Sequence, residues 1–371
     1  MANLFYLLTP LSYLELFGFR VILLQVFLGL AIALFGIYRR PKIFLWSSFL
    51  GLIFLVVVTI FYAFFSGYYE SLMSIVVFLL LMFFSFYFAS NGFVGVAEAK
   101  SLYVFGCLFV ACGLIFQLLA HKYFGVVFFR HALFGGVRNA YSFIWMDYSF
   151  ISLFVVSCLP LVLAYKSRLI SFSISSVLLF ASIVTSARTG MAAVVLFILV
   201  LLSWKYLIAL VRGRLALKYL ILSAAMVAIP LVSVYALPLI TGRQLTASSS
   251  GRFEGFALGF QFLLNHPFFG ALLDKELYKS TVSYVPHNIF LFPLFMGGLL
   301  YFSAFMAFLS LLIWDIKFAD SDILAAVLIC FLGFQFIPSF FSAYFFAVLL
   351  GIAMASSKIN KELVRLPNSY V

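Results

Sequence analysis

The chain has 371 residues, of which 66% are hydrophobic and only 9% are charged. Several apolar runs reach the length of about 20 residues that a helix needs to cross a bilayer, which excludes a water-soluble globular fold. The formal net charge of +12 does not indicate a nucleic-acid partner, because the lysines and arginines of a membrane protein mainly mark its cytoplasmic loops. We therefore expect an all-α, polytopic membrane protein built as a single integral membrane domain.

The apolar runs predict about eleven transmembrane helices. Their expected positions are residues 18–38, 43–66, 72–93, 101–120, 149–165, 169–186, 189–204, 218–238, 287–312, 322–338 and 340–356. The run from Leu4 to Phe17 is short for a span, so both a twelfth transmembrane helix and an interfacial helix are open for residues 1–17. The connections are short except for two larger loops, 121–148 and 239–286.

The basic residues predict the orientation of these helices. When the spans alternate across the bilayer, 14 of the 23 lysines and arginines fall on one face, which the positive-inside rule makes cytoplasmic. Both larger loops then lie on the opposite, outer face. The arginines that break this charge rule are Arg130, Arg138, Arg188, Arg243 and Arg252.

Arg188 lies in a short connection between two predicted spans, where residues 185–190 read Thr-Ser-Ala-Arg-Thr-Gly. A tight turn of this composition would hold the arginine rigidly near the headgroup level, which suits bidentate binding of a phosphate. The alternative interpretation is a flexible arginine that anchors its helix at the interface.

Arg252 opens a predicted amphipathic helix near residues 251–264, in which phenylalanines recur at helical spacing after a run of serines. The free amides of its first turn, together with Arg252, would form an anion site. The alternative is a solvated arginine. Glu254, in the same turn, is one of the few carboxylates expected on the outer face and is a candidate substrate contact.

His287 follows Pro286 and opens another predicted span. A histidine at the aqueous mouth of a helix can act as a general base near neutral pH. The alternative is an interfacial histidine that is hydrogen-bonded to a loop carbonyl. The neighbouring Asn288, and Arg138 and Asp147 in the first larger loop, are further candidates for contacting a substrate.

Several familiar enzyme signatures do not occur in the sequence: there is no P-loop, no nucleotide-binding glycine fingerprint and no His-Glu-x-x-His. Metal-dependent sugar-nucleotide chemistry, a metal site and a bound cofactor are therefore not expected. Fixed cations and a histidine at the outer lipid edge instead indicate a lipid substrate that carries a diphosphate.

The ordered set of motifs between residues 120 and 300 resembles the O-antigen polymerase and O-antigen ligase superfamily of bacterial envelope enzymes. The segments that carry the resemblance are Ser186–Gly190, Ser250–Arg252, Asn265–Gly270, Pro286–Asn288 and Gly297-Gly298. One departure is that Ala271-Leu272-Leu273 follows the His-Pro-Phe-Phe-Gly segment, where the family often has a second glycine.

The resemblance implies a metal-independent, C-type membrane glycosyltransferase in the bacterial inner membrane, with its active site facing the periplasm. Its donor would be a glycan carried on undecaprenyl diphosphate. Arg188 and Arg252 would bind the diphosphate, and His287 would accept the proton of the attacking sugar hydroxyl or orient the acceptor. Arg138 and Arg243 are candidates for binding the second lipid diphosphate or the glycan.

The expected function is O-antigen polymerase, which transfers the growing glycan from undecaprenyl diphosphate to the sugar of a new lipid-linked repeat unit. The additional outer arginines favour it, because a polymerase binds two lipid diphosphates. Its partners would be membrane lipid, a chain-length regulator and a flippase. The alternatives are an O-antigen ligase, which transfers the glycan to lipid A-core, and a transporter or flippase of lipid-linked oligosaccharides. The last is disfavoured because the charges lie at span ends and no internal repeat is visible.

Overall fold

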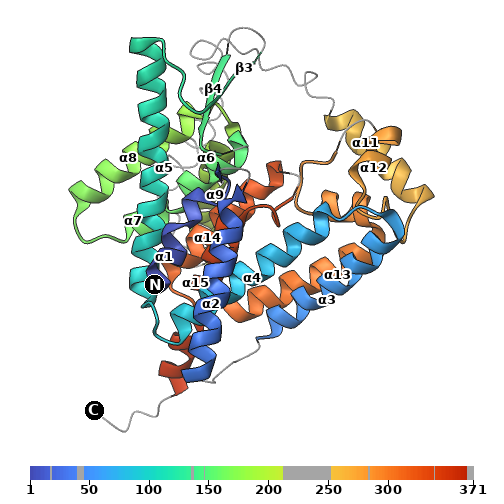
Figure 1. Ribbon diagram of the computed structural model, residues 1–371, viewed down its shortest axis with the longest axis horizontal. Coiled ribbons are helices and arrows are strands. Elements are labelled where there is room, and N and C mark those ends of the chain that lie inside the picture. The colour runs from blue at the N-terminus through green and yellow to red at the C-terminus, as the bar shows by residue number, and fades with distance from the viewer. Residues whose placement is uncertain are drawn as a thin grey trace.

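The computed structural model describes residues 1–16, 19–39, 46–134, 138–145, 147–211, 252–282, 285–337 and 339–365. It is 77% helical, as expected for an all-α membrane protein. Among the described helices, four are long and apolar enough to cross a membrane: α3 (Ser47–Ser66), α4 (Glu70–Ser90), α5 (Val96–Phe124) and α13 (Leu291–Ile316). Figure 1 shows α3, α4 and α13 side by side, with α5 standing beyond them.

The other elements are shorter, or contain or adjoin residues that are not described. They are α1 (Ala2–Leu7), η1 (Thr9–Leu11), β1 (Glu15–Leu16), β2 (Phe19–Arg20), α2 (Val21–Arg39), β3 (Arg130–Phe134), β4 (Arg138–Phe143), α6 (Tyr148–Ser157), α7 (Leu159–Leu163), α8 (Arg168–Val184), α9 (Arg188–Val211), α11 (Arg252–Asn265), α12 (Lys275–Val282), α14 (Ser321–Gly333), η3 (Phe334–Phe336) and α15 (Tyr344–Arg365).

Helices account for most of each predicted span that is described. The span expected at 218–238 lies outside the described residues, so the total of eleven and the orientation stay predictions. The expected span at 149–165 is divided into α6 and α7, because Pro160 removes a backbone N–H from the first turn of α7.

Two of the long apolar helices, α3 and α5, end where the sequence supplies a glycine. Gly67 (φ 71°) and Gly125 (φ 67°) take the left-handed conformation after α3 and α5, and each donates its N–H back into the last turn. Close packing between helices also relies on glycine. A Cβ atom at Gly351 of α15 would lie 2.5 Å from Ser85 Cβ of α4, so only a residue without a side chain permits this approach.

Residues 1–16 do not form one continuous helix. α1 is six residues long and is followed by η1, which is three. Buried Gln25 of α2 ties this segment down, because its Nε2 donates to the Phe5 carbonyl (2.9 Å) and to Thr9 Oγ1 (3.1 Å). The short helix is thus fixed against α2 through a satisfied buried amide.

The first larger loop contains a hairpin that the sequence did not predict. β3 and β4 pair antiparallel after α5, within the segment expected to be a loop at 121–148. Buried Gln117 of α5 holds both strands: its Nε2 donates to the carbonyls of Phe128 (2.5 Å) and Arg130 (2.9 Å), and its Oε1 accepts from Phe143 N (3.0 Å). One glutamine therefore supplies the backbone partners that the ends of a two-stranded sheet lack.

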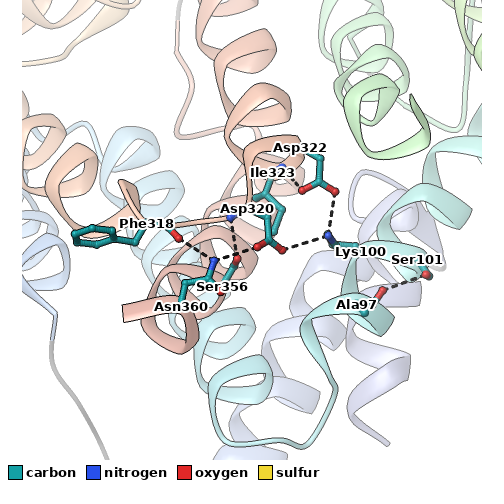
Figure 2. A network of polar contacts seen from close by, with 9 residues as sticks. All are labelled: Ala97, Lys100, Ser101, Phe318, Asp320, Asp322, Ile323, Ser356 and Asn360. Atoms are coloured by element: carbon teal, nitrogen blue, oxygen red, sulfur yellow. Dashed lines mark hydrogen bonds and ion pairs between the residues drawn. The ribbon is translucent and has the colours of Figure 1, made fainter. Parts of the chain in front are cut away.

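A polar network joins the ends of three helices on the side of the bundle where α5 and α14 begin (Figure 2). Lys100 Nζ contacts Asp320 Oδ2 at 3.3 Å and Asp322 Oδ2 at 2.9 Å. Asn360 of α15 donates to Asp320 Oδ1 at 3.0 Å, and Ser356 Oγ accepts from Asp320 N at 3.0 Å. We call this set of residues the Lys100 cluster.

Candidate functional site

Helix α13 is broken near its start, and the His-Pro-Phe-Phe-Gly segment fills the break. Gly298 has φ +63° and ψ −171°, which is not helical. Leu299 N donates to the Pro267 carbonyl at 2.8 Å, and Ala271 N donates to the Met296 carbonyl at 2.9 Å. The backbone groups released by the break are thus satisfied by a segment about thirty residues earlier in the chain. We call this contact between residues 267–273 and 296–300 the α13 joint.

Two glycines make the α13 joint possible. A Cβ atom on Gly298 would lie 2.5 Å from the carbonyl of Phe268, and one on Gly270 (φ +55°) would lie 2.6 Å from Gly298 N. Real Cβ atoms do not approach backbone this closely, and both residues need a left-handed conformation that favours glycine. Two of the segments that carry the sequence resemblance therefore contact each other.

The segment after Gly270 departs from the family pattern, and the structure gives its path. Leu272 (φ 52°) and Leu273 (φ 63°) are left-handed although they carry side chains. Leu273 N donates to the Met296 carbonyl at 3.0 Å, which holds this conformation in place. Asp274 then caps α12, since its Oδ1 accepts from the backbone N–H of Glu276 (2.9 Å) and of Leu277 (3.2 Å).

His287 and Asn288 form the turn that precedes α13. His287 Nδ1 lies 2.8 Å from the Val285 carbonyl; because a carbonyl only accepts, Nδ1 carries the proton of this hydrogen bond. Asn288 Oδ1 accepts from two amides of the helix start, and its Nδ2 donates to Gln335 Oε1 at 3.0 Å. The loop-carbonyl bond is the one that the alternative interpretation of His287 predicts. It also orients the ring, so that Nε2 is the acceptor nitrogen whenever the imidazole is neutral.

Arg188 opens α9 and is exposed, in a turn that is held firmly to α6. Ser186 has φ +61°. Gly190 N donates to Ser152 Oγ at 3.2 Å, and the hydroxyls of Ser152 and Ser182 are 2.7 Å apart. A Cβ atom on Gly190 would meet Ser152 Oγ at 2.4 Å, so the glycine is required for this approach. The backbone that carries Arg188 therefore has little freedom.

The Arg188 turn and the His287 turn are joined through α6 and α14. Gly190 contacts Ser152, and a Cβ atom on Gly333, at the end of α14, would lie 2.3 Å from the adjacent Leu153. Gln335, two residues beyond Gly333, accepts the hydrogen bond from Asn288. Packed contacts thus run from one turn to the other without a break.

The remaining predicted site residues stand as follows. Arg252 and Glu254 lie in the first turn of α11, which packs on α13 through the rings of Phe260 and Phe295, whose centroids are 4.9 Å apart. Arg138 is the first residue of β4. The side chains of Arg138, Arg252 and Glu254, and the whole of Arg243, lie outside the described residues.

Asp147 has a structural role as the N-cap of α6. Its Oδ1 accepts from Ser149 N at 2.6 Å and from Phe150 N at 3.0 Å. Asn288 similarly accepts hydrogen bonds from the first backbone amides of α13. Contact of Asp147 or Asn288 with a substrate stays a prediction. Within the described ranges, no three His, Cys, Asp or Glu side chains lie where they could hold a metal ion together.

A cleft that the sequence did not predict opens between α4, α12, α13 and the connection of α14 to α15. It measures about 340 Å³ including its open mouth. Lys275 Nζ and Glu70 Oε1, 3.0 Å apart, form an ion pair among its lining residues, and the Tyr68 hydroxyl also bonds to Glu70. In the sequence, Glu70 is visible only as an acidic residue at the start of an apolar helix. Glu70 and Lys275 are 205 positions apart, so no local spacing predicts their ion pair. We call this the Glu70 cleft.

No known protein-family model and no curated protein matches the sequence.

Proposed function

We propose that the chain is a membrane glycosyltransferase of the O-antigen polymerase type, with about eleven transmembrane helices and an active site on the periplasmic face of the bacterial inner membrane. The observation that carries the proposal is the α13 joint. Two sequence motifs of the resemblance meet there, α11, which begins at Arg252, packs on α13, and the His287 turn directly precedes α13. The rigid Arg188 turn connects to the same region through α6 and α14.

The proposed reaction needs a cationic site and a base, and these residue types supply both. A hydroxyl of the acceptor sugar attacks the anomeric carbon of the donor, and the bond from that carbon to the lipid diphosphate breaks. Arg188 and Arg252 stabilise the charge that develops on the departing diphosphate. His287 accepts the hydroxyl proton at Nε2, the nitrogen that its bond to the Val285 carbonyl leaves as acceptor.

Polymerase activity, rather than ligase activity, follows from the number of outer arginines. A polymerase holds one lipid diphosphate on the donor and a second on the acceptor, whereas lipid A-core is not carried on a lipid diphosphate. Arg138 and Arg243 are the residues we assign to the second diphosphate. A deletion strain tests this step: one repeat unit on lipid A-core indicates a lost polymerase, and lipid A-core without any O-antigen indicates a lost ligase.

Alanine variants of the three proposed catalytic residues test the site. We expect Arg188→Ala, Arg252→Ala and His287→Ala each to lower the rate of glycan transfer by about 100-fold or more, as loss of a charge-stabilising group typically does. Arg168→Ala is the matched control, because Arg168 also opens a helix and is exposed. Long glycan of normal amount from all three variants, at unchanged protein level, would overturn the proposal.

A further inference from the structure

The Glu70 cleft has the chemistry of a site for an uncharged sugar ring, and we propose that it binds a sugar of the acceptor glycan. This inference rests on the proposed function for the identity of the glycan, and on the cleft itself for the kind of ligand.

The cleft offers hydroxyl groups and a balanced charge. Ser71, Ser74, Ser339 and Ser342 are among its lining residues. The hydroxyls of Ser71, Ser339 and Ser342 make no hydrogen bond within the part of the chain that the structure describes. Polar groups beside a cavity need partners, which water supplies until a ligand replaces it.

The charge of the cleft selects against a phosphate. Glu70 and Lys275 neutralise each other, so the lining has no excess of positive charge. Sugar hydroxyls donate to a carboxylate and accept from an ammonium, and the lining also includes Phe292 and Phe341, which are largely buried. The balanced charge therefore favours an uncharged sugar over a lipid diphosphate.

One wall of the cleft is held by a chain of aromatic contacts. The Tyr13 hydroxyl bonds to the Ser342 carbonyl and accepts from Tyr344 N at 3.2 Å. The Tyr13 ring lies 4.3 Å from Trp145, whose Nε1 donates to the Pro10 carbonyl at 2.8 Å. The backbone at Ser342 is thus fixed before any ligand arrives, which lowers the entropy cost of binding.

The cleft adjoins the proposed base. Phe292 N donates to the Asn288 carbonyl at 3.0 Å, so Phe292 lies one helical turn beyond the residue that follows His287. The opposite wall, at Ser339, is four residues beyond Gln335, which accepts the hydrogen bond from Asn288. A sugar in the cleft would lie within reach of the His287 turn, and its neighbouring unit could present the attacking hydroxyl there.

Binding of a lipid-free oligosaccharide tests this inference without using catalysis. The probe is the single repeat unit cut from the producing strain's own surface polysaccharide, and the full chain is held in nanodiscs. Saturation-transfer NMR measures the dissociation constant. We expect Glu70→Gln and Ser71→Phe each to weaken binding by about tenfold or more, through loss of a charged hydrogen bond and through filling of the cleft.

The controls lie on α12, outside the lining residues. Lys279→Ala breaks the exposed pair with Glu276, and Ser280→Phe adds the same bulk as Ser71→Phe at an exposed site. Both should bind the oligosaccharide like the wild type. If Ser71→Phe does not fold, Glu70→Gln gives the answer alone because it preserves the volume of the side chain.

The failures of the two proposals are distinguishable. Wild-type affinity of both Glu70→Gln and folded Ser71→Phe overturns the sugar site, and so does binding of inorganic pyrophosphate in competition with the oligosaccharide. Neither result bears on Arg188, Arg252 or His287. Conversely, normal long glycan from the three alanine variants overturns the proposed function, while weakened oligosaccharide binding by the Glu70 variant still supports a sugar site.

Discussion

Lys100 and Lys275 each pair with carboxylates across helices that are distant in the sequence, yet their surroundings differ. Lys100 contacts two aspartates, and the side chain of Asp322 is only 15% exposed. Lys275 pairs with Glu70, whose side chain is 61% exposed beside a cleft lined in part by serine hydroxyls that make no hydrogen bond among the described residues. The protein itself satisfies the Lys100 cluster, whereas the Glu70 cleft leaves polar groups for another molecule. The same pairing of charges thus serves as a clamp at one place and as part of a binding site at another.

The largest effect is expected at the α13 joint, which supports the region of the Glu70 cleft. Gly298→Ala should lower the free energy of unfolding by about 2–4 kcal/mol, because the new Cβ atom clashes with the Phe268 carbonyl and the residue keeps a positive φ. Chemical denaturation in nanodiscs measures the change, and glycan transfer should fall with it. Gly95→Ala is the control, since nothing lies within 4 Å of a Cβ atom there. Equal stability of the two variants would show that the joint is not required.

A smaller loss of stability is expected at the Lys100 cluster. Lys100→Met leaves Asp322 and Asp320 without their cation and should lower the free energy of unfolding by about 1–2 kcal/mol, less than for a fully buried pair because these side chains are partly exposed. Binding of the repeat-unit oligosaccharide should not change. Exposed Lys166, replaced by Met, is the control. Weakened oligosaccharide binding in Lys100→Met would contradict the interpretation that the Lys100 cluster stabilises the fold and the Glu70 cleft binds the ligand.

The sequence predicted the helical membrane architecture because apolar length is a local property, and a helix is present in every expected span except 218–238, which lies outside the described residues. It could not predict the hairpin β3–β4, since the signal is Gln117, a single glutamine in an apolar helix that bonds to three distant backbone groups. The Ser/Thr/Gly composition of the Arg188 turn predicted that the turn is rigid. The hydrogen bond from Gly190 N to Ser152 Oγ holds it against α6.

The Glu70 cleft and the α13 joint were beyond prediction for a common reason. Both depend on residues that are far apart in the chain and that meet only after the helices pack. In the sequence, Gly270 resembles an ordinary loop glycine and Gly298 an ordinary membrane-helix glycine. That both positions must lack a Cβ atom appears only when the two backbones lie in contact. The identity of the ligand is likewise absent from local patterns, because the groups of the cleft come from four separate segments.

Replacing the other lysine sharpens the comparison with Lys100. Lys275→Met should change the free energy of unfolding by less than about 1 kcal/mol, because an ion pair with a largely exposed carboxylate contributes little. The affinity of the Lys275→Met variant for the oligosaccharide should nevertheless fall. Denaturation of both lysine variants in the same nanodiscs makes the test. A stability loss as large as that of Lys100→Met would mean that the Glu70 pair is also a structural clamp.

The smallest effect is a pH dependence at the Lys100 cluster. Burial alone would raise the pKa of Asp320, but hydrogen bonds from Asn360 and the charge of Lys100 hold its pKa below the usual value of 3.8. A carboxyl whose pKa is lowered on folding stabilises the protein above the unfolded pKa, and this contribution is lost as the pH falls through the folded pKa. The stability difference between the wild type and Asp320→Asn should therefore be constant from neutral pH down to about pH 4 and shrink below it. Denaturation midpoints of both proteins across this range measure the difference, and the other carboxylates cancel because both chains share them. A difference that grows with acidification would show that Asp320 is stabilised by some other interaction than the charge of Lys100.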